Sequence, residues 1–428
     1  MSDWNTYTLS QVGSIVTGNT PSTKNNAFWI GEIPFYSPAD FNGSVYCENT
    51  ERTVSEEALI YGRLIPKNSI MVTCIGSIGK MSISEKSGLT NQQINSLVPF
   101  ENFEFKYIYY LILNNIEKFK NLAPQTTIPI LNKSEFGRFA FKFHKLPEQK
   151  KIATILQSID KNIEKTEALI AKYQLIKAGL MQDLFTRGIG ADGKLRPTRD
   201  QAPELYQETQ IGWIPKEWDV INLGDISDIA SGITLNSKLS PDQNIVVPYL
   251  RVANVQDGYL DLTEVKEVTV SQTAISKLML ISGDVLMNEG GDFDKLGRGT
   301  VWQGEIDCCI HQNHVFRVRV DRDVLRPYFL AFWSESNFGK KYFILSSKQS
   351  TNLASINSTQ LKAYPIGVPS IDEQLEIETR IKAANSRIDT LNAENKKLNK
   401  QKQGLMHDLL TGKKRVTVDE VEADHVGI

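Results

Sequence analysis

Two long segments of the chain, residues 146–186 and 371–411, carry apolar side chains at alternating intervals of three and four residues. This spacing gathers the apolar positions into one stripe along an α-helix. Neither segment has a proline after its opening residues, and both are rich in residues that favour helix. The stripes consist of Ile152, Leu156, Ile159, Ile163, Thr166, Ile170, Tyr173, Lys177, Leu180 and Leu184, and of Ile377, Ile381, Ala384, Ile388, Leu391, Asn395, Leu398, Lys402, Leu405 and Leu409.

A stripe kept over about five heptads is typical of a coiled coil. We predict that the two helices pair antiparallel, because each helix leads away from its own domain and the domains must not collide. The predicted partner-helix seam comprises Ile159, Ile163, Ile170, Tyr173, Ile381, Ile388, Leu391 and Leu398. Polar Lys177, Asn395 and Lys402 would fix the register of the pair at a cost in stability. The alternative is an amphipathic helix packed only on its own domain.

The second segment repeats the first without a gap, each residue matching one 225 positions later (371 − 146 = 225). A period this long indicates two copies of a domain-sized unit rather than a solenoid. The identical pairs include Glu148/Glu373, Gln149/Gln374, Gly179/Gly404, Leu180/Leu405, Met181/Met406, Asp183/Asp408, Leu184/Leu409 and Thr186/Thr411.

The regions before the helices repeat as well, so that Trp4 and Gly18 match Trp218 and Gly232 at an interval of 214 residues (218 − 4 = 214). Near the end of each copy, QTTIPILNKSEF from residue 125 corresponds to STNLASINSTQL from residue 350. In the first copy, apolar runs at 33–36, 70–75 and 94–100 predict strands, and 103–122 predicts a helix. The fold class is therefore α+β, with two mixed α/β domains, two long helices and a pseudo-two-fold tandem repeat.

The predicted boundaries follow from these shifts in pattern. A first domain occupies residues 1–145 and a first spacer helix 146–187. Residues 188–210 are polar, contain Gly and Pro and lack periodicity, which predicts a linker. A second domain covers 211–368, a second spacer helix 369–412 and a polar tail 413–428.

Composition limits which classes of protein this chain can belong to. The net charge is −2, so any affinity for nucleic acid must come from local patches or from a partner. No apolar run is long enough to span a membrane, and the start of the chain has no secretory signal. The four cysteines have no zinc spacing, which fits a reducing cytoplasm.

Motifs for catalysis and for cofactor binding are missing from the sequence. It lacks an Asn/Asp-Pro-Pro-aromatic box, a glycine-rich adenosylmethionine loop, a Walker A motif and helicase motifs. Asp242 followed by Glu264-Val265-Lys266 could suggest a nuclease, but such a pattern is expected by chance. His311 and His314 lack the further ligands that a metal site needs. We therefore predict no catalytic residue and no metal site.

Polar clusters at the ends of predicted strands are instead candidates for contacts with DNA. Glycines in them permit close approach of the backbone, Lys and Arg suit phosphate or guanine, and Asn and Gln suit adenine. An ordinary loop or a hydrogen bond inside the core is the alternative at each position, but similar clusters occur in both copies. The candidates are Asn19, Thr20, Ser22, Lys24, Ser77, Lys80, Asn91, Gln92 and Gln93 in the first copy, and Arg251, Asn254, Lys295, Arg298, Gln312 and Asn313 in the second.

This pattern resembles the specificity subunits of type I restriction–modification systems. The resemblance rests on LPEQKKIATIL at 146–156 and its echo at 371–381, on GLMQDLFT and GLMHDLLT, and on the matched domain openings and QTTIPILN/STNLASIN segments. It implies two target-recognition domains that each read half of a split site on double-stranded DNA. It also implies that the helices set the spacer and dock two methyltransferase subunits, with restriction subunits joining the full complex.

Catalysis would then belong to those partners, which would bind S-adenosylmethionine and, for restriction, ATP and Mg²⁺, while this chain would bind no cofactor. Two rival hypotheses remain open. One is a stand-alone DNA methyltransferase or nuclease, against which the missing motifs weigh. The other is a coiled-coil scaffold without a role in binding DNA.

Overall fold

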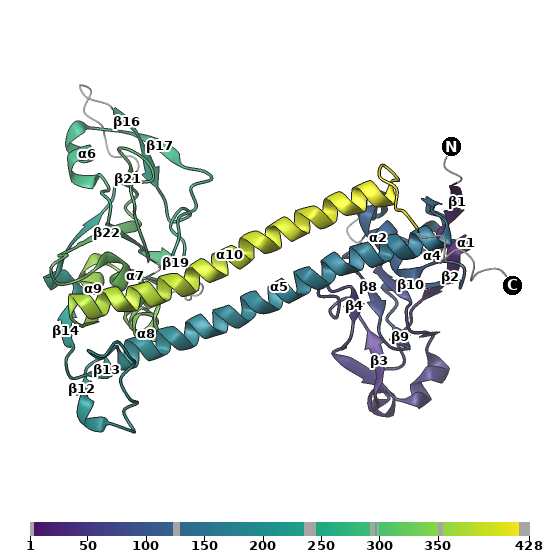
Figure 1. The fold of residues 1–428 in the computed structure, drawn as a ribbon, viewed down its shortest axis with the longest axis horizontal. Coiled ribbons are helices and arrows are strands. Elements are labelled where there is room, and N and C mark those ends of the chain that lie inside the picture. Colours follow the sequence, from purple (N-terminus) through teal and green to yellow (C-terminus); the bar gives the residue numbers. More distant parts are fainter. Residues whose placement is uncertain are drawn as a thin grey trace. The chain divides into compact units, whose positions relative to one another are not determined.

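A computed structural model describes residues 4–122, 129–234, 245–291, 296–297, 299–349 and 354–418. These residues form two compact units. Unit 1 combines Met1–Leu169 with Leu391–Ile428, and unit 2 is Ile170–Thr390. The long helices α5 (Leu146–Arg187) and α10 (Ile371–Leu410) each contribute to both units (Figure 1).

Unit 1 is built on three sheets. The central sheet has the strand order β2-β10-β7-β8-β4, the second has the order β5-β3-β9-β6, and β1 pairs with β11. The strands are β1 (Asn5–Thr8), β2 (Gly13–Thr17), β3 (Ile33–Tyr36), β4 (Tyr46–Cys47), β5 (Arg52–Val54), β6 (Leu64–Ile65), β7 (Ile70–Thr73), β8 (Met81–Ser84), β9 (Gly88–Thr90), β10 (Ile94–Pro99) and β11 (Ala140–Phe143). The short helices are α1 (Leu9–Val12), η1 (Asn26–Trp29), η2 (Glu56–Tyr61), α2 (Phe105–Asn114), α3 (Ile116–Leu122) and α4 (Lys133–Arg138).

Unit 2 repeats this topology with the sheets β15-β22-β18-β20 and β17-β16-β21 and the pair β14-β25, and adds β12-β13 and β19-β24-β23. Its strands are β12 (Tyr206–Thr209), β13 (Gly212–Pro215), β14 (Asp219–Asn222), β15 (Ser227–Ser231), β16 (Ile245–Leu250), β17 (Lys266–Val270), β18 (Val285–Asn288), β19 (Gly290–Gly291), β20 (Gly299–Val301), β21 (Ile310–His311), β22 (Val315–Val320), β23 (Lys348–Gln349), β24 (Ala354–Ser355) and β25 (Pro365–Val368). Its short helices are η3 (Pro203–Leu205), η4 (Leu223–Asp225), α6 (Gln272–Leu278), α7 (Pro327–Glu335), α8 (Asn337–Ser346) and α9 (Ser358–Lys362).

Strand register makes the repeat explicit. Leu97 of β10 lies opposite Ile15 of β2 and Ile70 of β7, as Val318 of β22 lies opposite Ile229 of β15 and Val285 of β18. In both units the second sheet contains one parallel pair, β3 with β9 and β16 with β21. The expected tandem α+β repeat is confirmed.

The repeated sequence motifs form the same local structures. Asn132 and Asn357 each cap a short helix, in a capping box with Glu135 and Gln360 respectively. Gln149 and Gln374, near the start of the long helices, are buried and accept hydrogen bonds from the N–H groups of Glu104 and Arg326. These two identical residues therefore fasten each long helix to the start of a neighbouring short helix, α2 in unit 1 and α7 in unit 2.

The two long helices run antiparallel within each unit. In unit 1, Lys402 pairs with Asp160, and Asn395 contacts Glu167. Residue numbers therefore decrease along α10 in the direction in which they increase along α5. In unit 2, Arg387 lies over the ring of Tyr173, and Met181 shares a core with Ile377 and Ile381. The antiparallel coiled coil expected from the 3–4 spacing is confirmed.

Two expectations differ from the structure. The helix expected at 103–122 is divided at Asn115, so that α2 and α3 form separate helices. The segment at 188–210, expected to be a linker, is a packed part of unit 2. Arg196 within it is buried and forms ion pairs with Glu373 and Glu217, and β12 pairs with β13. Ion pairs with distant partners leave no periodic signal in the sequence, which is why this packing was not predicted.

Candidate nucleic-acid interface

In unit 1, the loop after β2 lies against the turn between β9 and β10. Gly18 donates its N–H to Ile94 O at 3.0 Å, and a Cβ at Gly18 would collide with the backbone of Thr90 and Asn91. Glycine is required there because the two backbone segments approach each other so closely. The Thr20 hydroxyl donates to Gln92 Oε1 at 2.6 Å. The structure thus brings together two polar clusters that lie more than sixty residues apart in the sequence.

The amides of this turn are partly committed to each other. Asn91 Nδ2 donates to Gln93 Oε1 at 3.0 Å, and Asn91 Oδ1 accepts the N–H of Gln93 at the same distance. Gln92 is exposed between them. Of the three amides, Gln92 is therefore the one best placed to reach a base edge.

The β7–β8 turn carries Ser77 and Lys80, and both side chains are exposed. Gly76 and Gly79 have φ values of +73° and +97°, which a residue with a side chain rarely adopts. Thr73 Oγ1 accepts the N–H of Lys80 at 3.0 Å, and Cys74 donates its N–H to Gln93 O at 2.7 Å. These bonds hold the turn beside the amides at 91–93.

Asn19 has a different role from the one predicted. Its Nδ2 donates to the carbonyl oxygen of Tyr61 at 2.6 Å, and its Oδ1 is buried. The amide therefore holds the end of η2 instead of facing a base. Ser22 and Lys24 are exposed on the same loop.

Unit 2 places Gln312 and Asn313 in the turn between β21 and β22, which corresponds to 91–93 of unit 1. Gln312 donates its N–H to Leu250 O at 2.8 Å, as Asn91 donates to Tyr36 O at 3.1 Å. Both side chains are half-buried. Gly232 packs against His311 and Gln312 as Gly18 packs against Thr90 and Asn91.

Asn254 is a correction to the predicted DNA-reading set. It is 2% exposed, and its Nδ2 donates to the carbonyl oxygens of Asp261 and Glu264. Its Oδ1 accepts the N–H of Arg251, as Asp40 Oδ2 accepts the N–H of Ser37 in unit 1. Asn254 and Asp40 thus organise equivalent turns, and the Asn254 amide is unavailable to a base.

The Arg251 side chain is also partly occupied by a contact within the protein, because its guanidinium donates to Glu264 O at 3.2 Å. Lys295 and Arg298, the cationic candidates of the second copy, lie outside the described residues, as does Asp242. The other half of the suggested nuclease pattern, Glu264, is exposed and pairs with Arg251. No constellation for hydrolysis is assembled around it among the residues that the structure describes.

His311 is buried next to the turn that carries Gln312 and Asn313. Its Nδ1 lies 2.6 Å from Val315 O, and burial lowers the pKa of the imidazole to about 4. The ring is therefore neutral at pH 7 and is no source of charge for phosphate. His314 lies on the surface 2.6 Å from Glu289 Oε2, and in the described parts of the chain no group of three His, Cys, Asp or Glu side chains is arranged for a metal.

The predicted seam positions lie on the inner faces of the helices. Ile159, Ile163 and Leu391 in unit 1 and Ile381 in unit 2 are buried. Leu398 in unit 1 is half-buried, as are Ile170, Tyr173 and Ile388 in unit 2. Apolar residues outside the seam are exposed instead, namely Leu169 on α5 in unit 1 and, in unit 2, Leu175 and Ile176 on α5 and Leu375 on α10.

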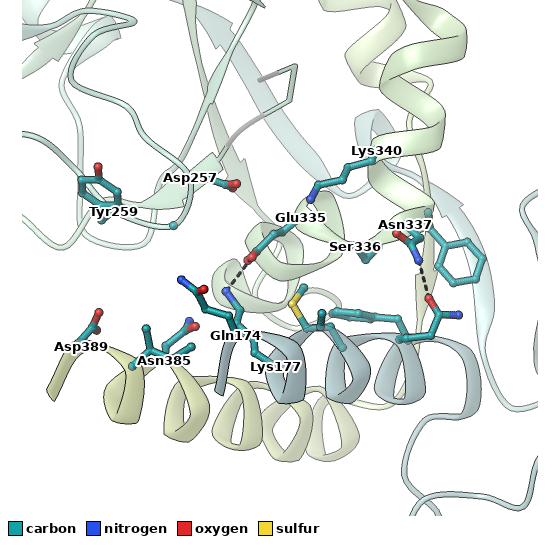
Figure 2. A pocket seen from close by; sticks show the side chains of 17 residues that line it. Gln174, Lys177, Asp257, Tyr259, Glu335, Ser336, Asn337, Lys340, Asn385 and Asp389 are labelled. Atoms are coloured by element: carbon teal, nitrogen blue, oxygen red, sulfur yellow. Dashed lines mark hydrogen bonds and ion pairs between the residues drawn. The ribbon is translucent and has the colours of Figure 1, made fainter. Parts of the chain in front are cut away.

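Unit 2 also contains a cavity of about 630 Å³ beside α5, α7 and α10 (Figure 2). Lys177 from the helical stripe points into it and pairs with Glu335 at 2.7 Å. Asn337 donates to Gln182 at its far end, and Asp257 and Tyr259 border it from a loop.

The sequence matches the family described as type I restriction modification DNA specificity domain, over residues 1–173 and 215–400. The chain belongs to this family. The type I restriction enzyme MjaVIII specificity subunit of Methanocaldococcus jannaschii is 23% identical over 97% of this chain and 93% of its own length. The MjaIX specificity subunit from the same organism is 28% identical over 60% of this chain, which spans 59% of that relative.

The fold is similar to that of a solved structure. The crystal structure of the type I restriction-modification S subunit from M. genitalium superposes with a TM-score of 0.56, at 16% identity over 95% of this chain and 96% of that one. The chain thus has the fold of a specificity subunit. No helix among the described residues is both long and apolar enough to cross a membrane.

Residues 59–63 were not singled out from the sequence. They connect to the candidate interface through Asn19 and through Arg63, whose guanidinium donates to Thr17 O at 2.9 Å. The available signal was Ile60-Tyr61, two large side chains next to Gly62 within the mainly apolar run ALIYGRLI.

Proposed function

We propose that this chain is the non-catalytic, sequence-reading subunit of a type I restriction–modification complex, and that each domain reads one half of a split, asymmetric DNA site. The observation that carries the proposal is the equivalence of two polar turns on one scaffold. Asn91–Gln93 and Gln312–Asn313 sit at the same place in the β-topology but present different side chains. Different side chains in equivalent places are what two different half-sites require.

The long helices would set the distance between the half-sites and dock two methyltransferase subunits that methylate adenine. A helix of 42 residues such as α5 is about 63 Å long. Leu175, Ile176 and Leu375 in unit 2 are exposed apolar residues on helices whose seam positions are already covered. Exposed apolar surface of this kind favours a protein partner.

Cofactors would belong to the partners. S-adenosylmethionine would be bound by the methyltransferase subunits, and ATP and Mg²⁺ by restriction subunits. Since the chain carries a net charge of −2, the methyltransferase subunits would also supply much of the contact with phosphate. The chain alone should therefore bind DNA weakly at physiological salt.

Exchange of residues 1–145 for the first domain of another family member tests the proposal. The complex with methyltransferase subunits is assembled, and methylated adenines are mapped in genomic DNA. The expected result is that one half-site changes and the other stays. A simultaneous change of both halves would contradict the assignment of one reader to each domain.

The two rival hypotheses give different results. Methylation or cleavage of DNA by the pure chain with adenosylmethionine or Mg²⁺ would support a stand-alone enzyme. A complex that methylates DNA equally well with and without this chain's domains would support a scaffold.

A further inference from the structure

An exposed apolar element adjoins the candidate interface of unit 1. Ile60 is 81% exposed and Tyr61 58% exposed, both at the end of η2, while Ala58 in the same helix is fully buried. Ala58 shares a small core with Phe28 and Leu89 of β9. One side of this short helix is therefore anchored, and the other presents two large side chains to the exterior.

The element is held in place from two directions. Tyr61 O accepts from Asn19 Nδ2 at 2.6 Å, and Arg63 donates to Thr17 O at 2.9 Å. The ring of Tyr61 lies 5.0 Å from that of Phe28. A Cβ on Gly62 would collide with Leu89, so the chain turns closely over β9. The exposed isoleucine is thus on a fixed support and not on a loose loop.

Polar reading groups continue directly from this element. Asn19, which holds Tyr61, is followed by Thr20, which bonds to Gln92 at 2.6 Å. In the major groove, an A·T pair presents the N7 and N6 of adenine beside the C5-methyl group of thymine. The exposed Gln92 amide, which is linked to this element through Thr20 and Asn19, and the exposed Ile60 side chain are complementary to these two features of the edge.

We infer that Ile60 and Tyr61 form an apolar reading element that contacts the C5-methyl group of a thymine in the half-site read by the first domain. This inference rests on the proposed function. The ligand inferred for this exposed surface is double-stranded DNA, because two hydrogen bonds connect the surface to the turn at 91–93.

The second domain has a different surface at the corresponding place. There, α6 begins after N-cap Ser271 as η2 begins after N-cap Ser55, and Ile275 shares a core with Ile310 of the parallel strand β21. Counted from the caps, Ser276 and Lys277 stand where the first domain has Ile60 and Tyr61. Ile60 and Tyr61 therefore have polar counterparts at the same distance from the cap in the second domain.

The test uses the complex of the full chain with its methyltransferase subunits. Once the site has been mapped, each thymine of the first half-site is replaced in turn by deoxyuridine, which lacks only the methyl group. Loss of one buried methyl contact should lower affinity about fourfold at one position. The Ile60→Ala complex should bind the thymine and deoxyuridine duplexes equally, and Ser276→Ala should leave the native difference intact.

The outcomes separate this inference from the proposed function. Equal binding of all deoxyuridine duplexes by the native complex, or a half-site made only of G·C pairs, would overturn the inference while leaving sequence-specific reading in place. An Ile60→Ala chain that keeps the methyl preference but loses methyltransferase subunits on gel filtration would identify a protein contact instead. Methylation without any sequence preference would defeat the proposed function itself.

Discussion

Lys402 Nζ lies 2.6 Å from Asp160 Oδ1 and joins the two long helices inside unit 1. The same carboxylate accepts the hydroxyl of Tyr110 at 2.6 Å through its other oxygen. Lys177, which occupies the matching position of the first helix, pairs with Glu335 in unit 2. Each lysine of the helical stripe thus has an acidic partner, and the two partners come from different elements.

Replacement of Lys402 by Met should destabilise the chain by about 2–4 kcal/mol, because Asp160 is only 8% exposed and would lose its counter-charge. The free energy of unfolding measured by urea titration checks this. The double variant Lys402→Met/Asp160→Leu should recover only part of the loss, because it also removes the acceptor of the Tyr110 hydroxyl. Lys67→Met, which removes an exposed pair with Glu85, should change stability by less than about 1 kcal/mol. Equal effects of Lys402→Met and Lys67→Met would contradict a register-fixing role for the buried pair.

Arg196 should be the residue that keeps 188–210 packed. Glu373 accepts from Arg196 at 2.6 Å, from Ile189 N at 2.7 Å and from Trp218 Nε1 at 3.1 Å. Arg196→Met leaves this carboxylate without its cation and should cost about 3–5 kcal/mol. Limited proteolysis should then cleave within 188–205, while Arg199→Met, at an exposed position, should leave the segment protected.

His311 should make the stability of unit 2 depend on pH. Its folded-state pKa is about 4, below the ordinary value of 6.5, because burial disfavours the charged ring. The unfolded chain therefore binds more protons between these values, and stability falls as pH drops from about 6.5 to 4, by up to about 3 kcal/mol. In urea titrations across this range, His311→Gln should flatten the dependence and His314→Gln should not. A dependence that survives in His311→Gln would assign it to other groups.

Lys80 should contact phosphate rather than a base. Its side chain is exposed on the rigid β7–β8 turn, and an ammonium group binds phosphate as a point charge. For the assembled complex, Lys80→Ala should weaken binding to all sequences alike and reduce the slope of log K against log salt by about 1. Lys133→Ala, exposed on α4, is the matched control. Relaxed specificity at one base pair would instead make Lys80 a base reader.

The helices should act as a ruler. Four residues inserted after Ala168 lengthen α5 by about 6 Å, and DNA rises about 3.4 Å per base pair. The preferred spacer should grow by one or two base pairs while both half-sites stay fixed, as methylation mapping would show. Four residues inserted after Asp200, outside the helix, should leave the spacer unchanged. An unchanged spacer with full activity in the Ala168 variant would leave the helices as docking surfaces only.

Periodic and repeated features of the fold were predictable from the sequence. The 3–4 spacing identified both long helices, and β3 coincides with the apolar run at 33–36. Features that depend on distant partners were not predictable. From the sequence alone, Asn254 and Asn19 are both candidates for base contacts. The structure shows that Asn254 accepts a backbone N–H as Asp40 does, and that Asn19 donates to the carbonyl oxygen of Tyr61. The residue type alone does not show whether a polar side chain faces solvent or forms a hydrogen bond with a backbone group.

The packing of α10 in unit 1 has a consequence for synthesis of the chain. Met406, Leu409 and Leu410 share a core with Ile152 and Leu156, which are made some 250 residues earlier (406 − 156 = 250). Unit 2 lies wholly between these two stretches. On the ribosome, unit 2 can therefore be completed before residues 406–410 are made. Until then, Ile152 and Leu156 of the first helix lack the apolar contacts that those residues provide. Chaperone demand should be greatest in that interval and should end when residue 410 has emerged.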